Sequence, residues 1–391
     1  MGLKIVTGNH AAGYALAAAG EANRNARGAV CGIYPITPQT EIVEFVAKFP
    51  FSKGRVVAVE SEHSAMGVTL GASLEGARAF TASSSNGLAY MFENIMVAGW
   101  YRLPVVMAAV NRTLGPPWNI WADQTDTLCL RDGSWIQLYC ENNQEVVDTL
   151  LLAFRLAEDH RILLPVLVSM DAFIVSHTQQ ETDLPEQELV DKYLPPCDVP
   201  HRMNHQHPVT IGGLAWPRET LIQRYETQEA MENVPAVLDE CRVEFEKVFG
   251  RKVDGALEPF EVEDADIILV TSGTISTTTR ELLKKRRVNG EKIGMIKQKM
   301  IRPYPVEEML HLCRNAKKVG VLDRNYSAGV GGIFWIEMKS AMQGRRDNLL
   351  IQNYLTGMCG GDVTPDMINE CIDDLIGRDE ATEPIWKGID K

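Results

Sequence analysis

The sequence predicts an α/β protein, with a parallel sheet in a larger first domain and a smaller α/β unit behind it. Over roughly the first 180 residues, short apolar runs alternate with stretches of helical periodicity. A fresh apolar run then begins at 265, after a charged, helix-forming stretch. The length of 391 residues fits two or three domains of roughly 150 residues each.

Strands and helices are expected to alternate through the first part of the chain. Strands covered on both faces are near-continuous Val/Ile/Ala runs, and here they are predicted at 29–34, 55–59, 78–82, 104–110 and 164–170. The intervening helices are predicted at 11–24, 40–48, 64–74, 87–97 and 144–157. Ligands bind beyond the carboxyl ends of such parallel strands. The chemistry is therefore expected in the loops after Tyr34, Val59, Ala82 and Val110.

A connecting arm is expected between the two domains. The alternation stops over 179–206, where prolines break any long element, and a charged helix follows over 219–249. A second set of strands is predicted at 265–271, 292–296, 318–323 and 348–354, with a helix after the turn at 272–274. The predicted domains are therefore 1–253, whose arm covers about 179–253, and 254–391.

Composition excludes several classes of function. With 52 acidic and 39 basic residues, the net charge of −13 argues against a nucleic-acid partner. No apolar run approaches the ~20 residues needed to cross a bilayer, and the N-terminus carries no export signal. The eight cysteines never form CxxC, which favours reduced thiols, no metal site and a cytoplasmic location.

Common catalytic signatures are also missing. The sequence contains no GxGxxG, GxxxxGK[ST], GxSxG or HExxH, so simple dinucleotide, P-loop, hydrolase and zincin interpretations have no support. The glycine-rich run 329–332 favours a tight turn over a phosphate cradle.

The turn Tyr34-Pro35-Ile36-Thr37-Pro38 follows the first of the predicted parallel strands. Its two prolines fix φ and disfavour helix in the residues before them, which holds Thr37 in a rigid turn. A rigid hydroxyl at a strand end can bind a ligand. Taken alone, however, the residues favour a cap for the helix beginning near Thr40.

Two carboxylates, Glu60 and Glu62, lie where the next strand leads into a helix. A carboxylate near a helix N-terminus is stabilised by the helix dipole, so capping is the simpler interpretation. The functional alternative is a buried carboxylate that binds the ring nitrogen of a heterocycle.

Arg112 follows the strongly apolar strand 104–110 at the same sheet edge. Its guanidinium suits a substrate carboxylate, which it can bind with two parallel hydrogen bonds. A structural salt bridge to Asp123 or Asp126 is an equal alternative on the sequence alone.

Together these segments resemble one family. The stretches YPITP, VESEHSAMG, FTASSSNGLAYM, VNRTLGPPWNIWADQTD, RDGSWIQLYCENNQEVVDT and LPVLVSMDAFIVSHT are similar to the α subunit of 2-oxoacid:ferredoxin oxidoreductases of the pyruvate synthase type. The resemblance continues through VTSGT, IRPYP and TGMCGGDVTP and so covers nearly the whole chain.

The resemblance implies a fold and a reaction. The first domain would bind the pyrimidine ring of thiamine diphosphate, and the second would resemble the C-terminal domain of transketolase. The complex would convert a 2-oxoacid and coenzyme A into acyl-CoA, CO₂ and a reduced acceptor. A β subunit would hold the diphosphate and Mg²⁺, and iron–sulfur clusters would lie on partner subunits of the β, γ and δ types. Electrons would reach ferredoxin or a NAD-linked subunit.

The resemblance also implies residue roles. Glu62 would bind the pyrimidine ring and activate the cofactor, and Pro35 would be a further cofactor contact. Thr37 and Arg112 would bind the substrate carboxylate, which makes Glu62, Thr37 and Arg112 the expected catalytic set.

Departures from the family pattern bear on the substrate. Relatives that use oxalate carry a second arginine in place of Thr37, so a monoanionic 2-oxoacid is expected. Gly115 stands where the family has a serine, and Trp118 and Trp121 add aromatic surface. A bulky aryl substrate such as phenylglyoxylate is therefore predicted beside pyruvate.

Two questions stay open at this point. The glycine loop 357–364 lacks an arginine that many relatives have, which leaves a coenzyme A contact undecided. The alternative function is a thiamine-dependent, non-redox enzyme of the transketolase kind that is split over two chains.

Overall fold

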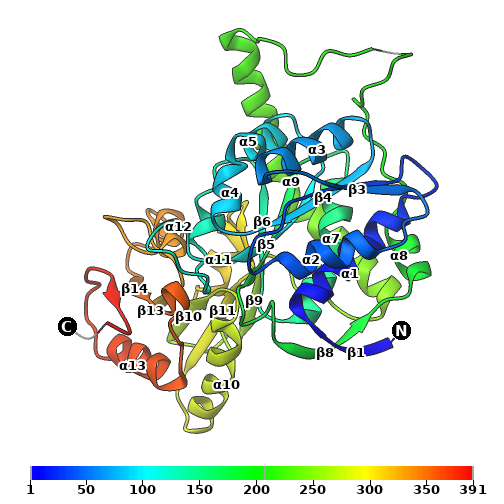
Figure 1. The fold of residues 1–391 in the computed structure, drawn as a ribbon. Helices are drawn as coiled ribbons and strands as arrows, with labels where there is room; N and C mark the ends of the chain where they lie inside the picture. Colours follow the sequence, from blue (N-terminus) through cyan, green and yellow to red (C-terminus); the bar gives the residue numbers. More distant parts are fainter. Residues whose placement is uncertain (1, 207, 390–391) are drawn as a thin grey trace.

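The computed structural model describes residues 2–206 and 208–389, and it contains two parallel-sheet domains (Figure 1). The first sheet has the strand order β12-β6-β7-β5-β4-β2-β3. Its strands are β2 (Ala29–Ile33), β3 (Gly54–Ala58), β4 (Arg78–Ser83), β5 (Val106–Asn111), β6 (Ile136–Cys140), β7 (Val166–Asp171) and β12 (Met300–Arg302). All neighbours are parallel except β12, which pairs antiparallel with β6.

Helices cover both faces of this sheet, as Figure 1 shows. They are α1 (Gly8–Ala22), α2 (Thr40–Lys48), α3 (Glu62–Leu74), α4 (Asn86–Tyr90), α5 (Phe92–Trp100), α6 (Thr125–Leu128) and α7 (Asn143–Ala157). Successive residues of β5 enter two different cores. Val106 and Ala108 pack with α1 and α7, whereas Met107 and Ala109 pack with α3 and α5. This double burial explains why β5 is a continuous apolar run in the sequence.

The second sheet has the order β15-β14-β13-β10-β11-β9. Its strands are β9 (Leu257–Phe260), β10 (Ile267–Thr271), β11 (Ile293–Gln298), β13 (Lys318–Asp323), β14 (Leu350–Leu355) and β15 (Ile385–Trp386). Its helices are α10 (Ile275–Val288), α11 (Val306–Leu312), α12 (Ile333–Met342), a 3₁₀ turn η1 (Met358–Gly360) and α13 (Pro365–Ile376). The predicted α/β fold with a second, smaller α/β unit is confirmed.

The predicted arm contains more structure than expected. Over 179–206 lie the strand β8 (Gln179–Leu184), which pairs with β1 (Gly2–Thr7), and the helix α8 (Gln187–Tyr193). The prolines limit these elements to six and seven residues instead of abolishing them. The predicted helix over 87–97 is also wrong in detail, because the chain divides at Met91 into α4 and α5.

The long helix α9 (Pro217–Phe249) connects the domains. Its second half buries Val234, Leu238 and Phe245 in the first core, with Phe245 against Tyr193 of α8. Its first turns project from the body of the molecule in Figure 1. Among the described residues, no helix is both long and apolar enough to span a membrane.

The strand β12 comes from the second part of the chain but belongs to the sheet of the first domain. It follows β11 of the second sheet directly, yet it completes the edge of the first sheet beside β6. The proposed boundary at 253–254 falls between α9 and β9, and β12 crosses back over it. The division into 1–253 and 254–391 therefore remains a proposal, because the sheet of the first domain includes residues 300–302 from the second part of the chain.

A buried charge cluster lies where the two sheets meet. Lys297, 1% exposed, has its Nζ 2.9 Å from an oxygen of Glu141 and 3.2 Å from one of Glu145. Lys299 reaches the same Glu145 oxygen at 3.0 Å. Burial alone would raise the pKa of Glu145, but the two ammonium groups lower it to about 2.

This cluster predicts acid sensitivity. The folded pKa of Glu145 lies below its unfolded value of 4.5, so the unfolded state binds more protons between these values. The stabilisation is present above pH 4.5 and is lost as the pH falls toward 2, by about 3 kcal/mol at 1.36 kcal/mol per pKa unit. We expect Glu145→Gln to be destabilising at pH 7 and the difference from wild type to shrink toward pH 3, measured by equilibrium unfolding. Glu307→Gln, at an exposed ion pair, is the control, and a difference that is independent of pH would contradict the assignment.

Candidate active site

The loops after β2, β3, β4 and β5 meet at the carboxyl edge of the first sheet, and they carry the predicted site residues. The first two of these loops hold Thr37 and Glu62, and the last holds Arg112.

Glu62 begins α3 but does not cap it. The cap is Ser61, whose Oγ accepts a hydrogen bond from the Ser64 amide at 3.2 Å. Glu60 accepts a hydrogen bond from the Ser64 hydroxyl, which lowers the pKa of Glu60, and its side chain is at the surface. Glu62 therefore does not cap α3 through a side-chain bond, which Ser61 makes instead, although its place in the first turn lets the helix dipole stabilise the carboxylate.

Glu62 is a largely buried residue whose carboxylate is unpartnered among the described residues. The residue is 7% exposed, and within the part of the chain that the structure describes its carboxylate has no hydrogen bond or ion pair. A Cβ added to Gly87 would lie 2.8 Å from Glu62 Oε1 and 2.5 Å from Ser83 Oγ. The Ser83 hydroxyl is also buried without a partner. The unpartnered Glu62 carboxylate and the buried Ser83 hydroxyl thus both face Gly87, and a buried hydroxyl without a partner is costly unless a ligand satisfies it.

Arg112 and Thr37 are brought together. Arg112 Nη1 donates to the Thr37 carbonyl oxygen at 2.7 Å, and its Nε donates to the Asn119 carbonyl oxygen at 3.2 Å. Partial burial lowers the pKa of Arg112, and the nearby Asp126 opposes that shift. The guanidinium is oriented by two neutral carbonyls, and no ion pair to it is found among the described residues. The predicted salt bridges to Asp123 and Asp126 are therefore wrong.

The turn 34–38 does not cap α2. The residue at the cap position is Gln39, which makes no side-chain capping bond, while its Nε2 donates to the Tyr34 carbonyl oxygen at 2.9 Å. Thr37 and Pro35 are both exposed at the sheet edge, where they are accessible to a ligand. Their roles in binding substrate and cofactor stay predictions.

Asp126 organises the loops after β4 and β5, a role that sequence reasoning missed. Its carboxylate accepts the backbone N–H groups of Ser85 at 2.9 Å and Arg112 at 3.0 Å, and Nδ2 of Asn111 at 2.9 Å. Complete burial raises the pKa of Asp126 to about 7 against the effect of these donors. Ser85 has φ of 49°, a strained value for a residue with a side chain. Its hydroxyl donates to the Thr113 carbonyl oxygen at 2.5 Å, which joins the two loops a second time.

The surroundings of Gly115 do not support a pocket for a bulky substrate. A Cβ there would meet no atom within 4 Å, so exchanging serine for glycine does not enlarge an enclosed space. The glycine instead suits φ of +81°. Trp118 is largely exposed, and Trp121 packs against Phe173 with ring centroids 4.7 Å apart and the rings tilted by 59°.

The glycine run 329–332 forms the predicted tight turn. Ser327 and Gly331 are bridged, and α12 begins immediately afterwards. The Asp323 carboxylate accepts the amides of Phe334 and Trp335 at the N-terminus of α12. A carboxylate of the chain itself therefore fills the position that a phosphate would need.

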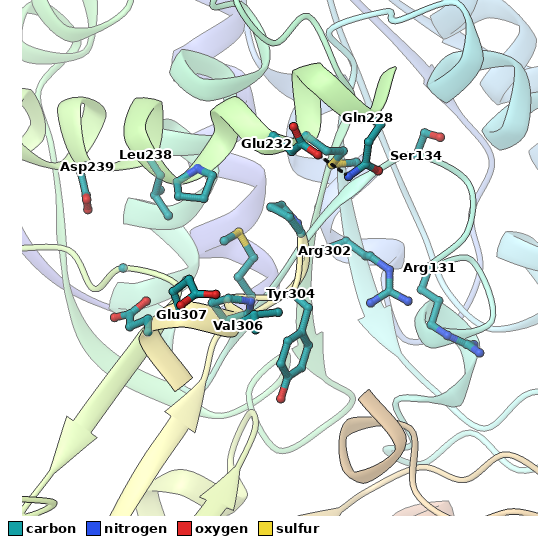
Figure 2. A pocket seen from close by; sticks show the side chains of 18 of the residues that line it. Arg131, Ser134, Gln228, Glu232, Leu238, Asp239, Arg302, Tyr304, Val306 and Glu307 are labelled. Carbon is teal, nitrogen blue, oxygen red and sulfur yellow. Dashed lines mark hydrogen bonds between the residues drawn. The ribbon is translucent and has the colours of Figure 1, made fainter. Parts of the chain in front are cut away.

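A cavity of about 1040 Å³ lies elsewhere in the molecule, between α9, β12 and the start of α11 (Figure 2). Figure 2 shows Arg131 and Arg302 on one side and Glu307 and Asp239 on another. None of the predicted site residues lines it. We therefore place the candidate active site at the carboxyl edge of the first sheet.

Comparison with known proteins identifies the class of this fold and site. Residues 21–242 match the family described as pyruvate flavodoxin/ferredoxin oxidoreductase, thiamine diphosphate-binding. Residues 265–368 match the core domain II of pyruvate:ferredoxin oxidoreductase. The first domain is thus a thiamine diphosphate-binding domain.

Full-length relatives define the family. Pyruvate synthase subunit PorA of Methanothermobacter thermautotrophicus is 40% identical over 394 residues, which cover 100% of this chain and 99% of the relative. Ketoisovalerate oxidoreductase subunit VorA of Pyrococcus furiosus is 41% identical over 377 residues, covering 95% and 93%. The chain belongs to the 2-oxoacid:ferredoxin oxidoreductase family and is its α-type subunit.

Solved structures share the fold at low sequence identity. A 2-oxoglutarate:ferredoxin oxidoreductase from Magnetococcus marinus has a TM-score of 0.71 and 21% identity. That match covers 96% of this chain and 65% of that one. A split-gene transketolase has a TM-score of 0.55 and 14% identity, covering 95% and 98%. These likenesses confirm the fold alone.

Proposed function

We propose that this chain binds the carboxylate of a monoanionic 2-oxoacid through Arg112 and Thr37, and the aminopyrimidine ring of thiamine diphosphate through Glu62. The observation that carries the proposal is the guanidinium of Arg112. Two backbone carbonyls orient it, no carboxylate of the described chain neutralises it, and it lies at the sheet edge that also holds the unpartnered Glu62. A fixed, unneutralised arginine is suited to binding a carboxylate.

The residues present fit the cofactor. The Ser83 hydroxyl is buried without a partner, the largely buried Glu62 makes no side-chain hydrogen bond or ion pair with the described residues, and both adjoin a glycine where a side chain would collide. When bound, thiamine diphosphate supplies the carbon nucleophile that 2-oxoacid decarboxylation requires. Glu62 would hold the ring and exchange a proton with it at Oε1, and Pro35 would line the same edge.

The rest of the reaction is proposed to depend on partner chains. A β subunit would hold the diphosphate and Mg²⁺, and iron–sulfur clusters on β-, γ- and δ-type subunits would pass electrons to ferredoxin or a NAD-linked subunit. Coenzyme A would take the acyl group. The relatives are themselves named as subunits, which supports an assembly of this kind. The eight free thiols agree with a reducing, cytoplasmic location.

Pyruvate or a small branched 2-oxoacid is the favoured substrate. The relatives quoted above are named for pyruvate and ketoisovalerate, and neither is named for an aryl acid. The open surroundings of Gly115 remove one argument for phenylglyoxylate. Thr37 supplies no second positive charge for a dianion such as oxalate. Family membership also overturns the non-redox transketolase alternative, to which the likeness is one of fold only.

A substrate panel tests this proposal. The purified native complex, with coenzyme A and a dye acceptor, would be assayed with pyruvate, 2-oxoisovalerate, 2-oxoglutarate, oxalate, indolepyruvate and phenylglyoxylate. We expect kcat/KM for pyruvate or 2-oxoisovalerate to exceed that for 2-oxoglutarate and oxalate by roughly tenfold or more, because one arginine binds one carboxylate. We expect the same margin over indolepyruvate and phenylglyoxylate, because the relatives are named for pyruvate and ketoisovalerate. Assays without coenzyme A or without 2-oxoacid are the controls. A preference for a dianion or for phenylglyoxylate would contradict the substrate assignment.

A further inference from the structure

A loop of the second domain forms hydrogen bonds with residues 119–123, which lie in the same long loop after β5 as Arg112. We define the clamp loop as residues 357–361, which follow β14 and include η1. The carbonyl oxygen of Cys359 accepts a hydrogen bond from Asn119 Nδ2 at 2.9 Å, and the amide of Gly360 donates to the Ala122 carbonyl oxygen at 2.9 Å. The Cys359 amide also donates to Asp123 Oδ2 at 3.3 Å. The second domain is therefore hydrogen-bonded to the segment 119–123 at Asn119, Ala122 and Asp123.

The same segment orients Arg112. The Asn119 carbonyl oxygen accepts the bond from Arg112 Nε, and the Trp121 carbonyl oxygen accepts one from the Thr113 amide at 3.0 Å. The Asn119 side chain fixes its own turn, because Oδ1 accepts the Trp121 amide at 2.7 Å. A displacement of 119–123 would thus be transmitted directly to the guanidinium and to the backbone beside it.

The contact is close enough that only glycine fits at its centre. Gly360 has φ of +86°, and a Cβ on it would lie 2.1 Å from the Cβ of Trp121. On its other side, Trp121 packs against the ring of Phe173, which follows β7. A larger residue at 360 would have to push Trp121 or open the clamp loop.

From these contacts we infer that the clamp loop is a positioning element for the substrate-binding arginine, so that the second domain sets the affinity of the active site for the 2-oxoacid. The inference rests on the proposed role of Arg112. It assigns the glycine loop to substrate positioning within this chain instead of to coenzyme A. Asn119 is the positioning residue through which the loop acts.

Gly360→Ala in the assembled complex tests the inference. The matched control is Gly290→Ala, because Gly290 has the same φ of +86° and no atom within 4 Å of an added Cβ. Both variants carry the same backbone strain, and only the first collides with Trp121. We expect Gly360→Ala to lower kcat/KM for the 2-oxoacid roughly tenfold or more, since small misplacements of a binding group have large kinetic effects. KM for coenzyme A should stay within about twofold, and Gly290→Ala should leave both values within about twofold.

A second variant covers the case in which Gly360→Ala does not assemble. Asn119→Ala removes the bond to Cys359, together with the bond from the Trp121 amide to Asn119 Oδ1, without adding bulk, and it should show the same selective loss for the 2-oxoacid. Unchanged kcat/KM for the 2-oxoacid in both variants, or a loss confined to KM for coenzyme A, would overturn the inference. Arg112→Lys separates the two hypotheses. If Arg112→Lys lowers kcat/KM for the 2-oxoacid and the two clamp-loop variants do not, the inference about the clamp loop is wrong and the proposed function stands. If Arg112→Lys has normal kinetics, the proposed function itself is wrong.

Discussion

Replacing Glu62 by glutamine is expected to lower kcat by roughly 10²–10⁴-fold, the range for loss of a positioned acid–base group. The proposed role requires a carboxylate that exchanges a proton, which an amide of the same shape cannot do. Stability should change little. The carboxylate makes no hydrogen bond or ion pair with the described residues, so an amide of the same shape breaks none. Steady-state kinetics and thermal denaturation of the complex provide the two measurements.

Glu60→Gln is the matched control for this experiment. Glu60 lies two positions away, carries the same functional group and is at the surface, where it accepts a hydrogen bond from Ser64. We expect its kcat to stay within about twofold of wild type, as for most surface substitutions. Near-normal turnover in Glu62→Gln, or equal losses in the two variants, would refute the cofactor role of Glu62.

Arg112→Lys is expected to lower kcat/KM for the 2-oxoacid by roughly 10–100-fold, which corresponds to one charge-assisted hydrogen bond of about 1.5–3 kcal/mol. Arg112 uses Nε and Nη1 to hold the carbonyls of Asn119 and Thr37, and its fork still presents N–H groups to a ligand. The compact ammonium group of a lysine cannot hold these two carbonyls and also bind the substrate carboxylate.

Kinetics with varied 2-oxoacid and, separately, varied coenzyme A would test this expectation for Arg112. The loss should appear only with the 2-oxoacid. Arg131→Lys is the control, because Arg131 lies 3.4 Å from Glu337 on another side of the domain and lines a different cavity. A fall in kcat/KM that is the same for both substrates would assign Arg112 a structural role.

The sequence predicts elements well where their ends are marked locally. The helix Thr40–Lys48 and the strand Lys318–Asp323 have the predicted bounds. Strands β6 and β12 were missed for a physical reason. In β6 the polar Gln137, although buried, interrupts the apolar run. Strand β12 has only three residues, so it is defined by its pairing with β6 and not by its own pattern.

Prediction of the candidate site from the sequence is limited in the same way. Arg112, Thr37 and Glu62 were predicted at strand ends, where side-chain chemistry is visible in the sequence. The role of Asp126 was not, because it binds backbone amides that leave no mark on residue type. The bond between Asn119 and Cys359 joins positions 240 residues apart, and only the tertiary fold places them together.

The return of β12 to the first sheet has a consequence for dissecting this protein. A fragment ending at residue 253 would contain the thiamine diphosphate-binding domain but would leave the outer edge of β6 without its neighbour. Unpaired backbone groups along an apolar strand are a template for association with other chains. Such a fragment is therefore expected to aggregate, and extending it only to Arg302 would leave β10 without its neighbour β13. The two sheets are best treated as one unit of expression.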